Sequence, residues 1–154
     1  MEYIVVKWVH ILSSTLLFGT GIGSAFYLLF ASLSRDTRTI AFVTRYVVIA
    51  DWLFTATTVV IQPFTGIYML HQVGIPMTSR WIFWSLVLYT IAIACWLPVA
   101  WLQVQMRNLA QRASTENSTM PALYWRYFKL WVALGFPAFF AFVTIFYFMV
   151  AKPG

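Results

Sequence analysis

Four apolar runs, each long enough to cross a bilayer, leave this sequence little room for any other fold. The hydrocarbon core of a membrane is about 30 Å thick, and a helix needs roughly 20 apolar residues to span it. The predicted spans cover residues 3–33, 46–71, 80–106 and 125–150. These runs are too long for helices of a soluble core, and they lack the alternation of barrel strands. We therefore expect a single all-α domain that forms a four-helix transmembrane bundle.

The composition supports a multi-pass membrane protein that is embedded in the lipid bilayer. Hydrophobic residues make up 62% of the 154 residues, and charged residues make up only 9%, which is far from the composition of a soluble domain. The net charge of +6 does not indicate a nucleic-acid partner. The basic residues lie in the short segments between apolar runs and form no basic face, so membrane topology explains them better.

The distribution of basic residues predicts the orientation of the bundle. The segments between spans one and two and between spans three and four share one side of the membrane, and cytoplasmic loops are enriched in Lys and Arg. Seven basic residues fall on that side: Arg35, Arg38, Arg45, Arg107, Arg112, Arg126 and Lys129. Three fall on the other: Lys7, Arg80 and Lys152. We expect a bacterial inner-membrane protein with both termini on the extracytoplasmic side.

One histidine, His10, lies about two helical turns inside the first span. An ionisable side chain at membrane depth is costly, so it is a functional-site hypothesis by default. It could also only hydrogen-bond a neighbouring helix and hold the bundle together. Helical geometry places His10, Ser14, Gly21 and Ser24 on one face. This face of small residues would admit either another helix or a flat cofactor, and a GxxxG spacing lies beside it.

The second span carries two further polar candidates. Gln62, in the segment QPFTG, is expected to turn away from lipid, as a contact between helices or as a contact to a ligand. His71 ends the span on the same membrane side as His10. It is a candidate second ligand to a haem iron, with a solvated histidine at a helix end as the alternative.

Asp51, near the start of the second span, is expected to form an ion pair with Arg45, Arg126 or Lys129, with a proton-handling role as the alternative. The spans contain no second carboxylate, so an acidic proton relay has few candidates. The chain also contains no HExxH motif and no nucleophile elbow, which disfavours a hydrolase.

Three segments carry a resemblance that covers essentially the whole chain: KWVHILSSTLLFGTGIGSAFY, DWLFTATTVVIQPFTGIYML and CWLPVAWLQVQMR. Together they resemble a bacterial family of predicted integral membrane proteins of unknown function. This resemblance implies a membrane protein and implies no activity.

A more distant similarity is to the HemJ-type protoporphyrinogen IX oxidases, small four-helix membrane proteins that bind a b-type haem. The similar segments are the K-x-x-H-I of residues 7–11, the RYFK of residues 126–129 and the K-P of residues 152–153. The resemblance implies that His10 is a haem ligand. It also implies a lysine early in helix three that is needed for activity, and this chain reads RWIFWSLVLY there. The similarity therefore favours a bound haem over a named reaction.

The sequence thus predicts a protein that binds haem b and has a redox role similar to HemJ. His10 would be the axial ligand, the face of Ser14, Gly21 and Ser24 would admit the porphyrin, and Gln62 would be a polar contact. If the protein is an enzyme, it is expected to be a haem-dependent membrane oxidoreductase. Two alternatives stay open. One is a non-catalytic accessory subunit of a homo-oligomer or larger membrane complex, and the other is a subunit of a small-molecule transporter.

Overall fold

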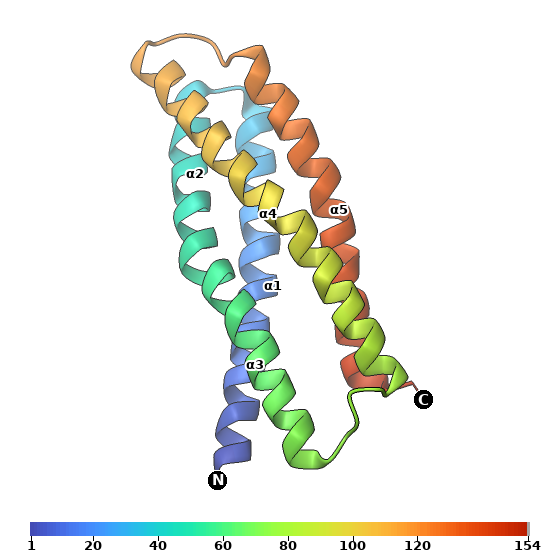
Figure 1. Cartoon of the computed structure of the whole chain (residues 1–154). Helices are drawn as coiled ribbons and strands as arrows, with labels where there is room; N and C mark the ends of the chain where they lie inside the picture. Colours follow the sequence, from blue (N-terminus) through green and yellow to red (C-terminus); the bar gives the residue numbers. More distant parts are fainter. Residues whose placement is uncertain (154) are drawn as a thin grey trace.

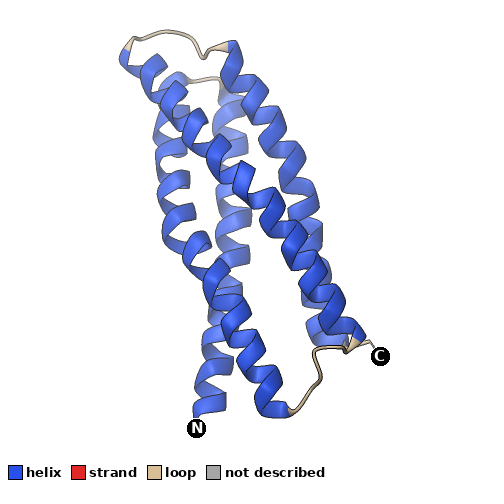
Figure 2. Cartoon of the chain, viewed as in Figure 1, coloured by secondary structure: helices blue, strands red, loops and turns tan. Residues whose placement is uncertain are grey.

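The structure is a computed structural model that describes residues 1–153, and every regular element in this range is a helix (Figure 2). In chain order the helices are α1 (Glu2–Ser34), α2 (Thr37–Ala50), the π-helix η1 (Asp51–Thr55), α3 (Ala56–Val73), α4 (Arg80–Thr115) and α5 (Ala122–Ala151). The segments α2, η1 and α3 follow one another without a break and form one span. The described chain therefore has four helices long and apolar enough to cross a membrane, as predicted.

The second span begins earlier than expected, at Thr37 instead of about residue 46. Only two residues of the polar segment between the first two spans are non-helical. Arg35 adopts a left-handed conformation with φ 56° and ends α1. Asp36 then caps α2, because its carboxylate accepts a hydrogen bond from the backbone N–H of Thr39 at 2.9 Å. A cap of this kind lets the helix start outside the apolar run that the hydropathy pattern detects.

The third span continues past its expected end near residue 106 and reaches Thr115. The polar segment QRASTENSTMPA follows the predicted third span, and its first five residues are helical. A polar sequence with good helix formers can extend a helix beyond the membrane, because water and side chains satisfy its surface. The other boundaries lie within a few residues of the prediction.

The packed core lies at the end of the bundle far from the termini. There α2 packs on α4, and α4 packs on α5 (Figure 1). Leu28, Ile40, Met106 and Tyr124 are fully buried in one cluster. The Tyr124 hydroxyl shares a hydrogen bond of 2.7 Å with the buried Ser32 of α1 and is therefore satisfied, whereas the indole Nε1 of Trp131 in the same cluster has no hydrogen-bond partner within residues 1–153.

The other end of the bundle is more open. Both termini lie there (Figure 1). The helices form two pairs at this end, because α3 packs on α1 and makes few contacts with α4, while α4 stays with α5. The side of the membrane that this end faces stays a prediction from the distribution of basic residues.

Asp51 lies at the start of the π-helix and is buried, with 5% of its surface exposed. Its carboxylate accepts hydrogen bonds from the indole Nε1–H of Trp96 on α4, at 3.1 and 3.3 Å. The expected ion pair with Arg45, Arg126 or Lys129 is wrong. Those three side chains are exposed, whereas Asp51 turns inward to a neutral partner. The charge of Asp51 and its distance along the sequence from the basic residues do not show that its side chain turns inward.

Pro63 lies inside α3 and removes one backbone hydrogen bond from the helix. Because proline has no N–H, the carbonyl of Val59, four residues earlier, loses its usual partner. In lipid an unpaired carbonyl is costly, so neighbouring groups must supply a donor. The hydroxyl of Tyr89 on α4 donates to the Val59 carbonyl. This bond ties α3 to α4 where the two helices otherwise have little contact.

We expect Tyr89→Phe to lower the free energy of unfolding by about 1–3 kcal/mol, because it leaves the Val59 carbonyl without a donor. The measurement is reversible unfolding of the full chain in mixed detergent micelles. Tyr147→Phe is the matched control, since Tyr147 is 63% exposed and forms no hydrogen bond within residues 1–153. Equal stability of the two variants would contradict the role given to the Tyr89 hydroxyl.

The cap of α2 predicts a dependence on pH. The hydroxyl and the backbone N–H of Thr39 donate to the Asp36 carboxylate and lower the pKa of Asp36 below its ordinary value of 3.8. A depressed pKa means that the cap stabilises the helix above the pKa of the unfolded chain and is lost as the pH falls through the folded pKa.

Hydrogen exchange of the Thr39 amide tests this pH dependence. As the pH drops below about 4, the wild type is expected to lose protection at Thr39 relative to an Asp36→Asn variant, whose side chain accepts a hydrogen bond without titrating. Parallel pH profiles for the two proteins would rule out the cap as the source.

Candidate functional site

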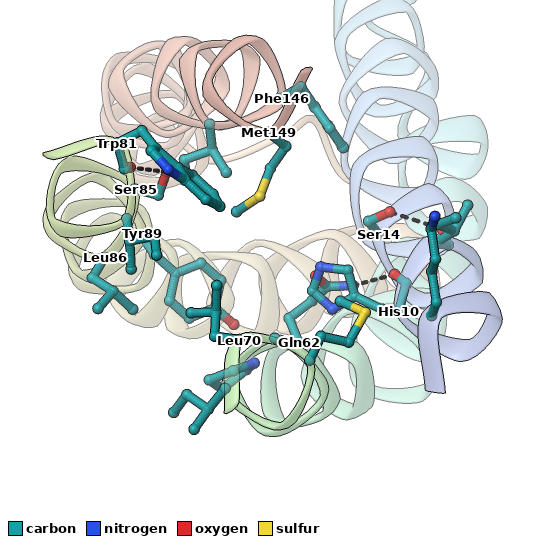
Figure 3. A pocket seen from close by; sticks show the side chains of 18 of the residues that line it. His10, Ser14, Gln62, Leu70, Trp81, Ser85, Leu86, Tyr89, Phe146 and Met149 are labelled. Carbon is teal, nitrogen blue, oxygen red and sulfur yellow. Dashed lines mark hydrogen bonds between the residues drawn. The ribbon is translucent and has the colours of Figure 1, made fainter. Parts of the chain in front are cut away.

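A cavity of about 550 Å³ opens between the two helix pairs at the end where the termini lie. All four spans contribute to its walls, which are mostly apolar or aromatic. His10 and Gln62 lie on one side, and Trp81, Phe146 and Met149 lie across the opening (Figure 3). Small-molecule and cofactor sites commonly have this character, with volumes of about 300–1,000 Å³ and a few convergent polar groups.

His10 is held in the cavity wall by a side chain of α3. Its Nδ1 lies 2.7 Å from the hydroxyl oxygen of Thr65. The Thr65 hydroxyl also lies within hydrogen-bond distance of the Ile61 carbonyl, at 2.8 Å. When it donates its proton to that carbonyl, its oxygen can accept the proton of Nδ1–H, and a neutral imidazole then carries its proton on Nδ1. The lone pair of Nε2 then forms no hydrogen bond within residues 1–153.

Gln62 fixes the backbone beneath the imidazole. Its Nε2 donates to the carbonyl of His10 at 2.8 Å and to the hydroxyl of Ser13. Ser13 is buried, and its hydroxyl also donates to the His10 carbonyl at 3.1 Å. The expectation that Gln62 turns away from lipid is confirmed, and Figure 3 shows Gln62 beside His10. The amide thus joins α1 to α3 at the level of the histidine.

Gly66 leaves space for the imidazole. A Cβ atom at this position would lie 3.4 Å from Cε1 of His10, so a larger side chain would press on the ring. Three residues of QPFTG therefore contact α1: Gln62 holds the backbone of His10, Thr65 holds Nδ1 and Gly66 permits the close approach.

The structure brings some of the predicted site residues together and separates others. Ser14 joins His10 and Gln62 in the cavity wall, although its hydroxyl donates to the Ile11 carbonyl at 2.7 Å. Gly21 and Ser24 do not line the cavity. The cavity ends near Leu17 on α1 and does not follow the small-residue face further.

His71, the candidate second ligand, is exposed at the end of α3 and does not line the cavity. Asp51 does not line it either, so this cavity does not connect Gln62 with Asp51, as a polar transport path through both residues would require. Within residues 1–153, no three His, Cys, Asp or Glu side chains gather to hold a metal ion. A metal at His10 would therefore need most of its ligands from outside the chain, as the iron of a macrocycle has.

Sequence reasoning did not find several residues of the site. Thr65 and Tyr89 lie on other helices than His10, and their pairing depends on the register between helices. The sequence could have indicated Lys7, because it lies three residues before His10 on the same helical face. Met149 comes from the last turn of α5, where the pattern is uniformly apolar, and Lys152 follows that helix directly.

Comparisons with known proteins bear on the identity of the whole chain. Residues 4–153 match a family model described as predicted integral membrane protein (DUF2269). No curated protein and no solved structure matches the chain. The similarity to HemJ-type oxidases therefore continues to rest on the short motifs quoted above. Because the family model covers nearly the full length, the chain belongs to the DUF2269 family of predicted integral membrane proteins.

Proposed function

We propose that this chain is a haem-binding protein of the bacterial inner membrane with a redox role, and that His10 is the axial ligand. One observation carries the proposal. The Thr65 hydroxyl oxygen lies 2.7 Å from Nδ1 of His10, and His10, whose Nε2 forms no hydrogen bond within residues 1–153, lines a mostly apolar cavity. Metal-bound histidines in proteins almost always donate their other ring N–H to an oxygen in this way, which fixes the tautomer and the ring orientation.

The chemistry of the cavity fits a haem. The walls are apolar and aromatic, as a flat macrocycle requires, and one imidazole from the protein suffices for axial ligation. When bound, the haem supplies one-electron chemistry at its iron. His10 would hold the iron, Thr65 would orient the imidazole of His10, and the apolar walls would exclude water. The exposed position of His71 gives it no part in this arrangement, so we assign His10 as the ligand from the protein.

A second candidate function is that of a subunit in a homo-oligomer or larger membrane complex. The observation that favours it is the glycine-rich stretch of α1. A side chain added at Gly19, Gly21 or Gly23 would meet nothing within 4 Å, so no helix of the chain packs there. A GxxxG spacing lets two transmembrane helices approach closely. This face and the haem site lie on different parts of α1, and the two functions are compatible.

The absorption spectrum of the detergent-purified full chain tests the haem proposal. We expect a Soret band in the wild type or after addition of haemin, and its loss in His10→Ala. Thr65→Val keeps the size of the side chain and removes the acceptor for Nδ1–H. We expect it to weaken haem affinity by about 10- to 100-fold, the usual effect of removing such an outer partner, and Thr65→Ser to restore it.

The other histidine of the chain gives the matched control. His71→Ala should retain the full Soret band, because His71 is exposed and outside the cavity. A purified protein that binds no haemin, or a His10→Ala variant with the wild-type spectrum and affinity, would overturn the proposal.

The glycine face predicts a change in assembly. We expect Gly19→Leu combined with Gly23→Leu to shift the oligomeric state or to release a co-purifying partner, as measured by light scattering in detergent and by mass spectrometry. Both positions have space in the single chain, so the bundle itself should fold normally. An unchanged assembly with a normal thermal unfolding curve would exclude this face as an interface.

A further inference from the structure

The charged residues of the cavity are of one sign. Its lining contains two cations, Lys7 and Lys152, and no Asp or Glu. Lys7 lies on α1, one turn before His10, and Lys152 follows the last residue of α5. Both lie toward the end of the bundle that carries the termini, whereas the remaining lining is mostly apolar. The cavity is therefore amphipathic, with a positive mouth and an apolar interior.

The protein does not use these two charges itself. Neither ammonium group forms an ion pair or a hydrogen bond within residues 1–153. The nearest acidic candidate in the sequence, Glu2, does not line the cavity, and its carboxylate accepts a hydrogen bond of 3.4 Å from Tyr68. Arg80, at the start of α4, adds a third positive charge at this end of the bundle. An anionic group at the mouth would therefore meet no carboxylate from the lining.

The spacing along α1 links the charge to the imidazole. Lys7 precedes His10 by three residues, so their Cα atoms differ by about 4.5 Å along the helix axis and share one face. The lysine side chain is long and flexible, and its ammonium can reach outward to water while its stem stays on the apolar wall. A ligand whose centre reaches His10 would therefore have an outer edge near Lys7, and Lys152 lines the same cavity from the end of α5.

From this arrangement we infer that the site takes a tetrapyrrole with carboxylates on one edge, and that these carboxylates face Lys7 and Lys152 at the mouth. The inference rests on the proposed function and adds to it the residues that bind the carboxylates and the direction in which the ligand enters. Leu17 and Tyr89 in the interior of the cavity would then contact the apolar edge of the macrocycle. A porphyrin without free carboxylates would lose the contact with the lysines and keep the contact with His10.

A pair of matched probes tests the direction. Haemin carries two carboxylates, and its dimethyl ester carries none. Both are titrated into the full chain in a zwitterionic detergent, with the Soret shift as readout. We expect the wild type to bind haemin about tenfold more tightly than the ester, because each of the two exposed ion pairs contributes up to about fivefold in affinity, or up to about 25-fold together. In the double variant Lys7→Gln and Lys152→Gln, the preference should disappear, and the affinity for the ester should not change.

The control is Lys129→Gln, which removes an equal charge from an exposed position of α5 outside the cavity. It should keep the wild-type preference for haemin. Equal affinity of the wild type for haemin and ester would overturn this inference and leave the haem proposal standing, as would a preference that survives in the double variant. Failure of both probes to give a Soret shift that depends on His10 would overturn the proposed function and this inference together.

Discussion

The side chain of Gln62 joins α1 to α3 in the half of the bundle where the helices diverge, and the candidate site depends on that contact. A primary amide in lipid needs partners from the protein, and here it donates to the carbonyl of His10 and to the hydroxyl of Ser13. This contact fixes the position of α3 along the axis of α1. Thr65 then lies opposite the imidazole, one turn further along α3. Because the Gln62 amide needs hydrogen-bond partners inside the membrane, the contact that it makes also places His10 opposite Thr65.

The two halves of the molecule differ in the interactions that hold their helices together inside the bilayer. The half with the loop between α1 and α2 is a conventional packed core, with Leu28, Ile40 and Met106 fully buried. The half with the termini keeps a cavity and compensates with hydrogen bonds between helices: Gln62 to α1, and Tyr89 to the carbonyl that Pro63 leaves free. Polar contacts can hold helices apart at a fixed distance, whereas apolar packing would bring them together.

The sequence predicts the four spans, because their length and hydropathy depend on composition alone, and it singles out His10 and Gln62, because polar groups at membrane depth are rare. Hydropathy misses the polar starts and ends of helices, such as residues 37–45, where a cap at Asp36 decides the boundary. The partners of side chains are a different problem. Asp51 meets Trp96, and His10 meets Thr65, through the relative rotation of helices. A single sequence carries no record of that rotation.

The π-helix between α2 and α3 determines this rotation for the second span. Each residue advances an α-helix by about 100°, and a π-turn accommodates one residue more than the helical repeat needs. The five residues from Asp51 to Thr55 therefore rotate the side chains of α3 about the helix axis relative to those of α2, within one continuous helix. Before the π-helix, α2 packs on both α1 and α4, and after it α3 packs on α1 and makes few contacts with α4. The second span thus keeps one neighbour along its length and leaves the other, and the cavity lies between the two helix pairs that result.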